Sequence, residues 1–145
     1  MSKTEDFLSK EEEQEIIEAI RLAELNTSGE IRVHLEKTAN GDATPRALEL
    51  FHTLKMDNTK RKNGVLIYVA VADKTFVIYG DEGINNLVEN DFWDCTKDLM
   101  QSHFKKGEFK KGLVEGILRS GDRLKKYFPY TDDDTNELSN EISKG

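Results

Sequence analysis

The chain has 145 residues, of which 37% are hydrophobic and 34% are charged, and its formal net charge is −7. This length suffices for one domain with a buried core, and the periodic placement of the apolar residues excludes an intrinsically disordered chain. The negative charge argues against nucleic acid as a partner, because an acidic surface repels phosphate backbones, and it favours metal ions or cationic partners.

The N-terminal segment from Met1 to Asp6 has no apolar region of the kind found in signal peptides. No stretch of the chain approaches the roughly 18 consecutive apolar residues that a membrane span requires. We therefore expect a soluble, cytoplasmic protein without a membrane partner.

The first predicted elements are a helix, a strand and a second helix. Ser9 and Glu12 form a capping box, and apolar residues then recur at three- and four-residue spacing, which predicts a helix over about residues 10–26. Residues 30–37 alternate between apolar and polar side chains, which predicts a half-buried strand. Thr44 and Pro45 are typical of a helix start, so a second helix is expected after Thr44.

A β-hairpin is predicted in the middle of the chain. Residues 64–72 are continuously apolar and rich in β-branched side chains, as in a central strand that is covered on both faces. Asp73 and Lys74 then connect this strand to a second one over residues 75–79, and the short connection predicts antiparallel pairing.

Two helices and a tail are expected in the last third of the chain. The first helix spans about residues 85–104, with Cys95 on its buried face, and the second spans about 108–127. Pro129 ends the second helix. Residues 130–145 form an acidic C-terminal tail with few apolar residues.

The order α-β-α-β-β-α-α predicts an α/β protein. We expect a three-layer α/β/α sandwich around a central mixed sheet of about four strands, three of them clear and a short fourth one hidden in the polar loops. The domain would comprise residues 1–129, followed by the tail 130–145, and the protein would be a monomer.

Several catalytic signatures are missing from the sequence. There is no Walker A loop, no G-x-G-x-x-G fingerprint and no G-x-S-x-G nucleophile motif. The three histidines, His34, His52 and His103, lack zinc-site spacing. These absences argue against a P-loop or dinucleotide-binding protein, an α/β-hydrolase and a zinc enzyme.

Four ordered segments resemble the TPM domain family. Residues 27–33, T-S-G-E-I-R-V, resemble the family's T-G-x-E-I entry to its first strand, and residues 63–67, N-G-V-L-I, resemble its core strand. Residues 79–83, Y-G-D-E-G, resemble its G-x-x-E-G loop, and residues 104–117 resemble its F-x-x-G-x-[YF]-x-x-G-[LI] closing helix. The chain departs from the family's leucine-proline-aspartate pattern after Gly83.

The resemblance implies a short, soluble, bacterial-type member of this family with an α/β/α sandwich fold. Family members are divalent-metal binders, often of calcium, and a thylakoid-lumen relative has been assigned an acid phosphatase activity linked to photosystem repair. For this chain the resemblance implies a metal-binding domain with an interaction or regulatory role, in which a protein partner is one possibility.

The candidate metal ligands are five acids. Asp81 and Glu82 follow a strand end between two glycines, where carboxylates must be solvated, paired or metal-bound. Glu30 begins a strand and matches the family's Glu, while Asp91 and Asp94 are one helical turn apart and would converge on the same crevice. The competing interpretation is that all five are ordinary solvated acids of turns, strand edges and helices.

Oxygen ligands select hard cations, and a flexible loop site favours calcium, with magnesium or manganese as alternatives. A metal-dependent phosphatase acting on phosphate esters remains the alternative function, with at most weak acid-phosphatase-like activity, because no nucleophile is recognisable. In that case Arg32 and His34 would be candidates for binding phosphate, although His34 is more simply a surface residue of its strand.

Overall fold

The computed structural model describes residues 8–56, 62–89, 91–129 and 142–144. Its elements are α1 (Lys10–Glu24), β1 (Glu30–Glu36), α2 (Ala43–Thr53), β2 (Gly64–Ala70), β3 (Thr75–Gly80), α3 (Glu82–Asn85), α4 (Asp94–Lys105), α5 (Phe109–Leu124) and β4 (Ser143–Lys144). Within these ranges no helix is long and apolar enough to cross a bilayer.

The strands form one mixed sheet in the order β3-β2-β1-β4. β1 pairs with β2 in parallel, and β2 pairs with β3 as the antiparallel hairpin that the sequence predicts. These three strands have six or seven residues each, whereas β4 has two and pairs in parallel with His34 and Leu35 of β1. The mixed α/β class is confirmed. The three longer strands are those that the sequence predicts clearly, whereas the short pairing of β4 with β1 lies in the C-terminal tail and not in the polar loops.

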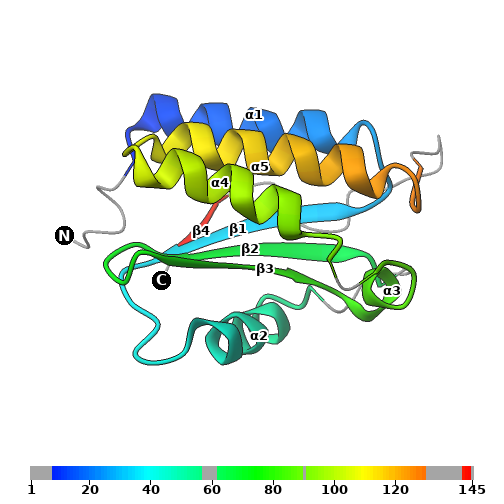
Figure 1. The fold of residues 1–145 in the computed structure, drawn as a ribbon, viewed down its shortest axis with the longest axis horizontal. Helices are drawn as coiled ribbons and strands as arrows, with labels where there is room; N and C mark the ends of the chain where they lie inside the picture. Colours follow the sequence, from blue (N-terminus) through cyan, green and yellow to red (C-terminus); the bar gives the residue numbers. More distant parts are fainter. Residues whose placement is uncertain (1–7, 57–61, 90, 130–141, 145) are drawn as a thin grey trace.

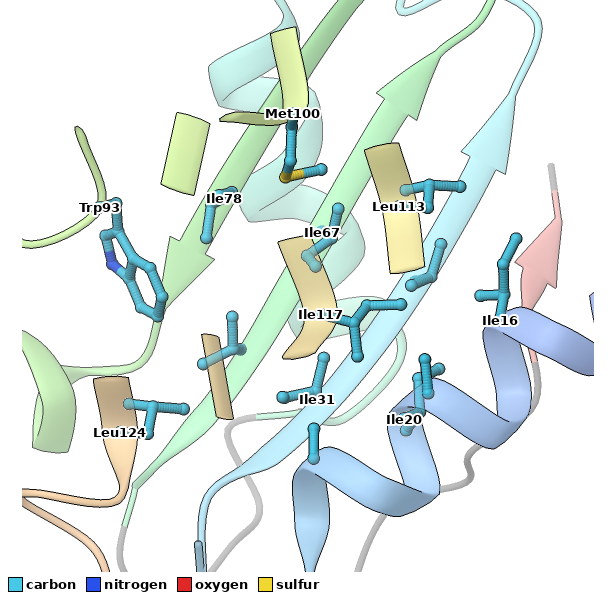
Figure 2. Packing of buried hydrophobic residues seen from close by; sticks show 14 of the residues in the cluster. Ile16, Ile20, Ile31, Ile67, Ile78, Trp93, Met100, Leu113, Ile117 and Leu124 are labelled. Atoms are coloured by element: carbon cyan, nitrogen blue, oxygen red, sulfur yellow. The ribbon is translucent and has the colours of Figure 1, made fainter. Parts of the chain in front are cut away.

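The larger hydrophobic core lies between one face of the sheet and three helices. Figure 1 shows α1, α4 and α5 together on this face. In Figure 2, Ile16 and Ile20 of α1 and Leu113 and Ile117 of α5 lie over β1 and β2, beside Ile31. The capping box predicted for α1 is present, because Ser9 accepts a hydrogen bond from the Glu12 amide and Glu12 accepts one from the Ser9 amide.

A smaller core lies on the opposite face, where α2 covers the sheet (Figure 1). Leu50 and Phe51 of α2 pack there against Leu66 and Tyr68 of β2. Every residue of β2 is buried, as expected for a strand covered on both faces. Asp42 rather than Thr44 caps α2, since its side chain accepts a hydrogen bond from the Thr44 amide.

The single helix predicted over residues 85–104 is wrong, because the chain forms the short helix α3, a turn and then α4. Phe92 and Trp93 are buried in the connection, so their apolar character reflects an anchored turn rather than a helix face. The inward face of α4 is instead formed by Thr96 and Met100. Cys95 is therefore exposed, contrary to the expectation that it is buried.

Candidate functional site

The loop after β3 holds Asp81 in a buried position, with 7% of its surface exposed. Its amide donates a hydrogen bond to the Gly64 carbonyl, 2.9 Å away, and its Oδ1 accepts one from the Glu82 amide at 2.7 Å. The second carboxylate oxygen, Oδ2, is buried and has no hydrogen-bond partner among the described residues. A buried carboxylate oxygen without a partner is costly, so this atom points to a missing partner.

Asp81 lies at the edge of a pocket of about 440 Å³. The lining combines acids and amides of the loop after β3 and of α3 with residues of α2, Tyr79 and Lys62: Asp81, Glu82, Asn85, Asn86, Phe51, His52, Lys62 and Tyr79. Asn85 is fixed beside the loop, because its Nδ2 donates to the Gly80 carbonyl at 3.0 Å. Burial and the negative charges of Asp81 and Glu82 raise the pKa of Tyr79, which indicates a negative potential in the pocket.

Glu30 lies at the same end of the sheet but does not line this pocket. It is the first residue of β1, it is buried, and it pairs with Gly64 of β2, on whose other side Asp81 is held. Its electrostatic neighbour is Glu24, whose Oε2 accepts a hydrogen bond from the Ile31 amide at 3.0 Å. Burial, and secondarily the charge of Glu30, raises the pKa of Glu24 to about 8 despite that hydrogen bond.

The last two predicted ligands lie apart from the pocket. Asp91 is exposed in the turn before α4, and Asp94 is the exposed first residue of α4. Among the described residues, no three His, Cys, Asp or Glu side chains are close enough together to hold a metal ion. The structure thus brings Asp81 and Glu82 to one pocket and Glu30 to the neighbouring strand, and a metal site built from all five acids stays a prediction.

The pocket also has an unexpected position relative to the strand directions. It lies at the carboxyl end of β3 but at the amino ends of the parallel strands β1 and β2. Ligands in open α/β sheets usually bind at the carboxyl ends of parallel strands. That general rule therefore gives no support to this pocket and directs attention to the opposite end of the sheet.

Sequence analysis missed a buried polar network at that opposite end, centred on Glu36. The Glu36 carboxylate accepts hydrogen bonds from the Tyr68 hydroxyl at 2.5 Å and from Arg46, whose Nε and Nη2 lie 2.8 and 2.9 Å from its two oxygens. His34 lies 3.4 Å from Glu36 through Nε2, and its Nδ1 is 2.9 Å from the Ser143 hydroxyl. His34 is only 3% exposed, so its interpretation as a surface residue is wrong.

The environment of the network shifts the pKa values of its members. Burial alone would raise the pKa of Glu36, but hydrogen bonds from Arg46, Tyr68 and His34 lower it to about 2. Burial lowers the pKa of His34. Two features of the sequence hint at this network. Polar residues alternate along residues 30–36, and Tyr68 is the one hydroxyl-bearing side chain in the apolar strand of residues 64–70.

Comparisons with known proteins bear on the whole domain. The family model of the TPM domain matches residues 1–123. The solution structure of BA42, from the psychrophilic bacterium Bizionia argentinensis, is 64% identical in sequence with a TM-score of 0.92, and the match covers 96% of each chain. A search of curated proteins found no match.

Two more distant solution structures share the fold alone. An N-terminal domain from P. gingivalis is 24% identical with a TM-score of 0.66, covering 83% of this chain and 78% of that domain. The N-terminal domain of the cg2496 protein from Corynebacterium glutamicum is 10% identical with a TM-score of 0.63, covering 95% and 80%. The fold is thus retained where most of the sequence has changed.

Proposed function

Because the chain belongs to the TPM domain family, we propose that it binds a divalent cation, preferably calcium, at the pocket beside Asp81 and Glu82. In this proposal the cation stabilises a domain with an interaction or regulatory role. The family membership supports metal binding in general, and the oxygen-bearing side chains of the pocket support this location for the ion.

One observation carries the proposal: Asp81 Oδ2 is buried at a pocket and lacks a hydrogen-bond partner among the described residues. A cation would be the missing partner, since a buried carboxylate is stable when it coordinates a metal. Glu82 and the side-chain oxygens of Asn85 and Asn86 provide further ligands of the same type around this pocket.

The donor set fits calcium better than a smaller or softer ion. All the candidate ligands are oxygens, which disfavours zinc. Fewer than three carboxylates come together in the part of the chain that the structure describes, so amide and carbonyl oxygens and water would complete the coordination. Calcium accepts six to eight such ligands in irregular geometry, whereas magnesium demands a near-ideal octahedron.

The proposal is tested by titrating calcium into protein that has been stripped with a chelator. Amide shifts should centre on residues 80–86, and the melting temperature should rise with calcium concentration. At a hundred times the dissociation constant, bound calcium should add about 2.7 kcal/mol to the free energy of unfolding. Asp81→Asn should abolish both responses. Asp98→Asn, at an exposed position of α4, is the matched control and should leave both unchanged.

Variants of the remaining predicted ligands define the extent of the site. Glu30→Gln, Asp91→Asn and Asp94→Asn would each weaken calcium binding if that acid approaches the ion, directly or through water. Calcium affinity that is equal in Asp81→Asn and wild type, or no response to calcium, magnesium or manganese, would refute the proposed site.

A metal-dependent phosphatase is the second candidate, and one observation favours it. His52 and Lys62 line the same pocket as the acids, so a phosphoryl group held by a cation there would meet a second, basic partner. His34, by contrast, uses both ring nitrogens in the Glu36 network. Hydrolysis of p-nitrophenyl phosphate by calcium-, magnesium- or manganese-loaded protein tests this function, which is rejected if Asp81→Asn and Glu30→Gln leave the rate unchanged.

A further inference from the structure

A second pocket lies at the other end of the sheet, between the β2–β3 hairpin and the turn that joins α4 to α5. Its volume is about 560 Å³, within the range of small-molecule sites. Figure 1 shows this hairpin and this turn at the same end of the molecule, opposite α3, whose residues line the acidic pocket. This is also the carboxyl end of the parallel strands β1 and β2, where open α/β sheets usually bind ligands.

The body of the pocket is apolar and aromatic. Three phenylalanines, Phe76, Phe104 and Phe109, and the valines Val69 and Val71 line it. The ring of Phe104 packs edge-on against Phe76, with centroids 5.2 Å apart, and is stacked on Phe109 at 4.9 Å. These contacts hold the aromatic wall in place, so the cavity is formed before any ligand arrives.

Gly112 of α5 makes room for this aromatic wall. A Cβ atom at position 112 would lie 2.5 Å from the ring of Phe104, which is closer than such atoms approach. The glycine therefore allows the Phe104 ring to lie against α5, at one side of the pocket.

The rim of the pocket is basic. Lys74, in the hairpin turn, and Lys105, the last residue of α4, line it, and among the described residues no acidic side chain does. The nearest acids in sequence have other partners: Asp73 accepts hydrogen bonds from Thr38, and Glu108 from His103. In a chain of net charge −7, two lysines at an otherwise apolar pocket favour an anionic ligand there.

We propose that this pocket binds an amphipathic carboxylate, with its hydrocarbon body against Phe76, Phe104 and Phe109 and its carboxylate between Lys74 and Lys105. The phenylalanine wall provides the apolar contact, and the two ammonium groups distinguish an acid from an alcohol of equal length. A free medium-chain fatty acid has this chemistry and fits a cavity of about 560 Å³.

The test uses octanoate as the probe and octan-1-ol as the neutral ligand of matched chain length. Octanoate should shift the side-chain resonances of Phe76, Phe104 and Phe109 with a dissociation constant of roughly millimolar order, as its small size allows. Octanol should bind more weakly. Each of Lys74→Gln and Lys105→Gln should weaken octanoate binding roughly two- to fivefold, the effect of one exposed ion pair, and leave octanol binding unchanged.

Lys97→Gln is the matched control, because Lys97 is exposed on the same helix as Lys105 and does not line the pocket. Its octanoate affinity should equal that of the wild type. The proposal is overturned if octanoate leaves the phenylalanine resonances unchanged up to about 10 mM, well above the dissociation constant expected for so small a ligand. It is equally overturned if octanol binds as tightly as octanoate, or if neither rim variant changes the affinity for octanoate.

Discussion

Glu36 shows how hydrogen bonds can outweigh burial at a single residue. Its carboxylate is 5% exposed, and an isolated charge in such a position would become protonated. Two nitrogens of Arg46, the Tyr68 hydroxyl and His34 Nε2 surround it instead. The charge is therefore retained, and it holds β1, β2 and α2 together through one group.

Removing one donor to Glu36 should destabilise the fold. Tyr68→Phe deletes the hydroxyl 2.5 Å from Glu36 Oε2 and preserves the ring, so it should cost about 1–3 kcal/mol, the value for a hydrogen bond to a buried charge. Urea denaturation measures the loss. Tyr79→Phe on β3 is the control, because its hydroxyl makes no hydrogen bond to Glu36. An equal effect of both variants would show that the Glu36 hydrogen bond contributes nothing.

The pH dependence of stability should carry the signature of Glu36. Its pKa is about 2 in the folded protein against an ordinary 4.5, so the stabilisation is complete above pH 4.5 and is lost as the pH falls from 4.5 to 2. Glu36→Gln lacks this titration, so the free-energy difference between wild type and variant should shrink across that window, by up to about 3 kcal/mol. A difference that stays constant from pH 6 to pH 2.5 would contradict the assignment.

At the scale of elements, α5 packs closely because glycines face its neighbours. Gly121 lies against Ala23 of α1, and Gly116 lies against Met100 of α4. A side chain at either position would separate the helices that cover the larger core. The two glycines differ in what they contact, since Gly121 meets backbone and Gly116 meets a flexible side chain.

This difference predicts unequal costs for two similar substitutions. In Gly121→Ala the new Cβ would lie 3.0 Å from Ala23 Cα and from its carbonyl oxygen, which cannot move without α1, so a net loss of about 1–3 kcal/mol is expected. In Gly116→Ala the Met100 side chain can turn away, and the gain in helix propensity of about 1 kcal/mol offsets part of the cost. Thermal unfolding ranks the two variants, and Gly116→Ala being the less stable would refute this account.

The elements that the sequence predicts well are those with an unbroken period and a local end signal. The helix from Lys10 to Glu24 has its capping box, and the helix from Phe109 to Leu124 keeps its apolar stripe throughout. The single helix predicted over residues 85–104 is wrong because Phe92 continues a helical spacing across a turn. Only tertiary packing distinguishes an apolar residue buried in a turn from one on a helix face. The two-residue strand at Ser143 has no periodicity to detect.

The candidate site was predictable only in part, for a similar reason. Asp81 and Glu82 are adjacent in sequence, so their closeness follows from one loop, whereas the pocket that they line also needs Phe51 and His52 of α2. Glu36, Arg46 and Tyr68 come from three separate elements, and their meeting depends on strand register. The alternation of β1 is visible in the sequence and predicts a solvent-facing polar side, because nothing local shows that α2 covers it.

On the scale of the whole molecule, the pockets at the two ends of the sheet differ in their charged side chains. Asp81 and Glu82 lie where β3 ends, whereas Lys74 and Lys105 lie where β3 begins and α4 ends. The two pockets share no lining residue. A cation and an amphipathic anion could therefore be bound at the same time without competition.

The C-terminal residues contribute one more contact across the whole chain. Ile142 packs against the larger core, and Ser143 and Lys144 extend the sheet at β1. The rest of the acidic tail, residues 130–141 and 145, lies outside the described residues. The contact joins segments that are more than a hundred residues apart, since the Ser143 hydroxyl meets His34 Nδ1.

Ending the chain at Glu141 should loosen this contact without dismantling the fold. Because β4 pairs with only two residues of β1, the expected loss of stability is about 1–2 kcal/mol, that of one or two hydrogen bonds and a half-buried isoleucine. The pKa of His34, lowered by burial in the full chain, should rise toward its ordinary value as the ring is uncovered, which an NMR titration of the imidazole measures. Ser143→Ala in the full chain is the control that removes the hydroxyl and keeps the strand pairing, so it should move the pKa of His34 less. An unchanged His34 titration in the shortened chain would mean that β1, β2 and α2 alone bury the ring and that β4 does not contribute to its burial.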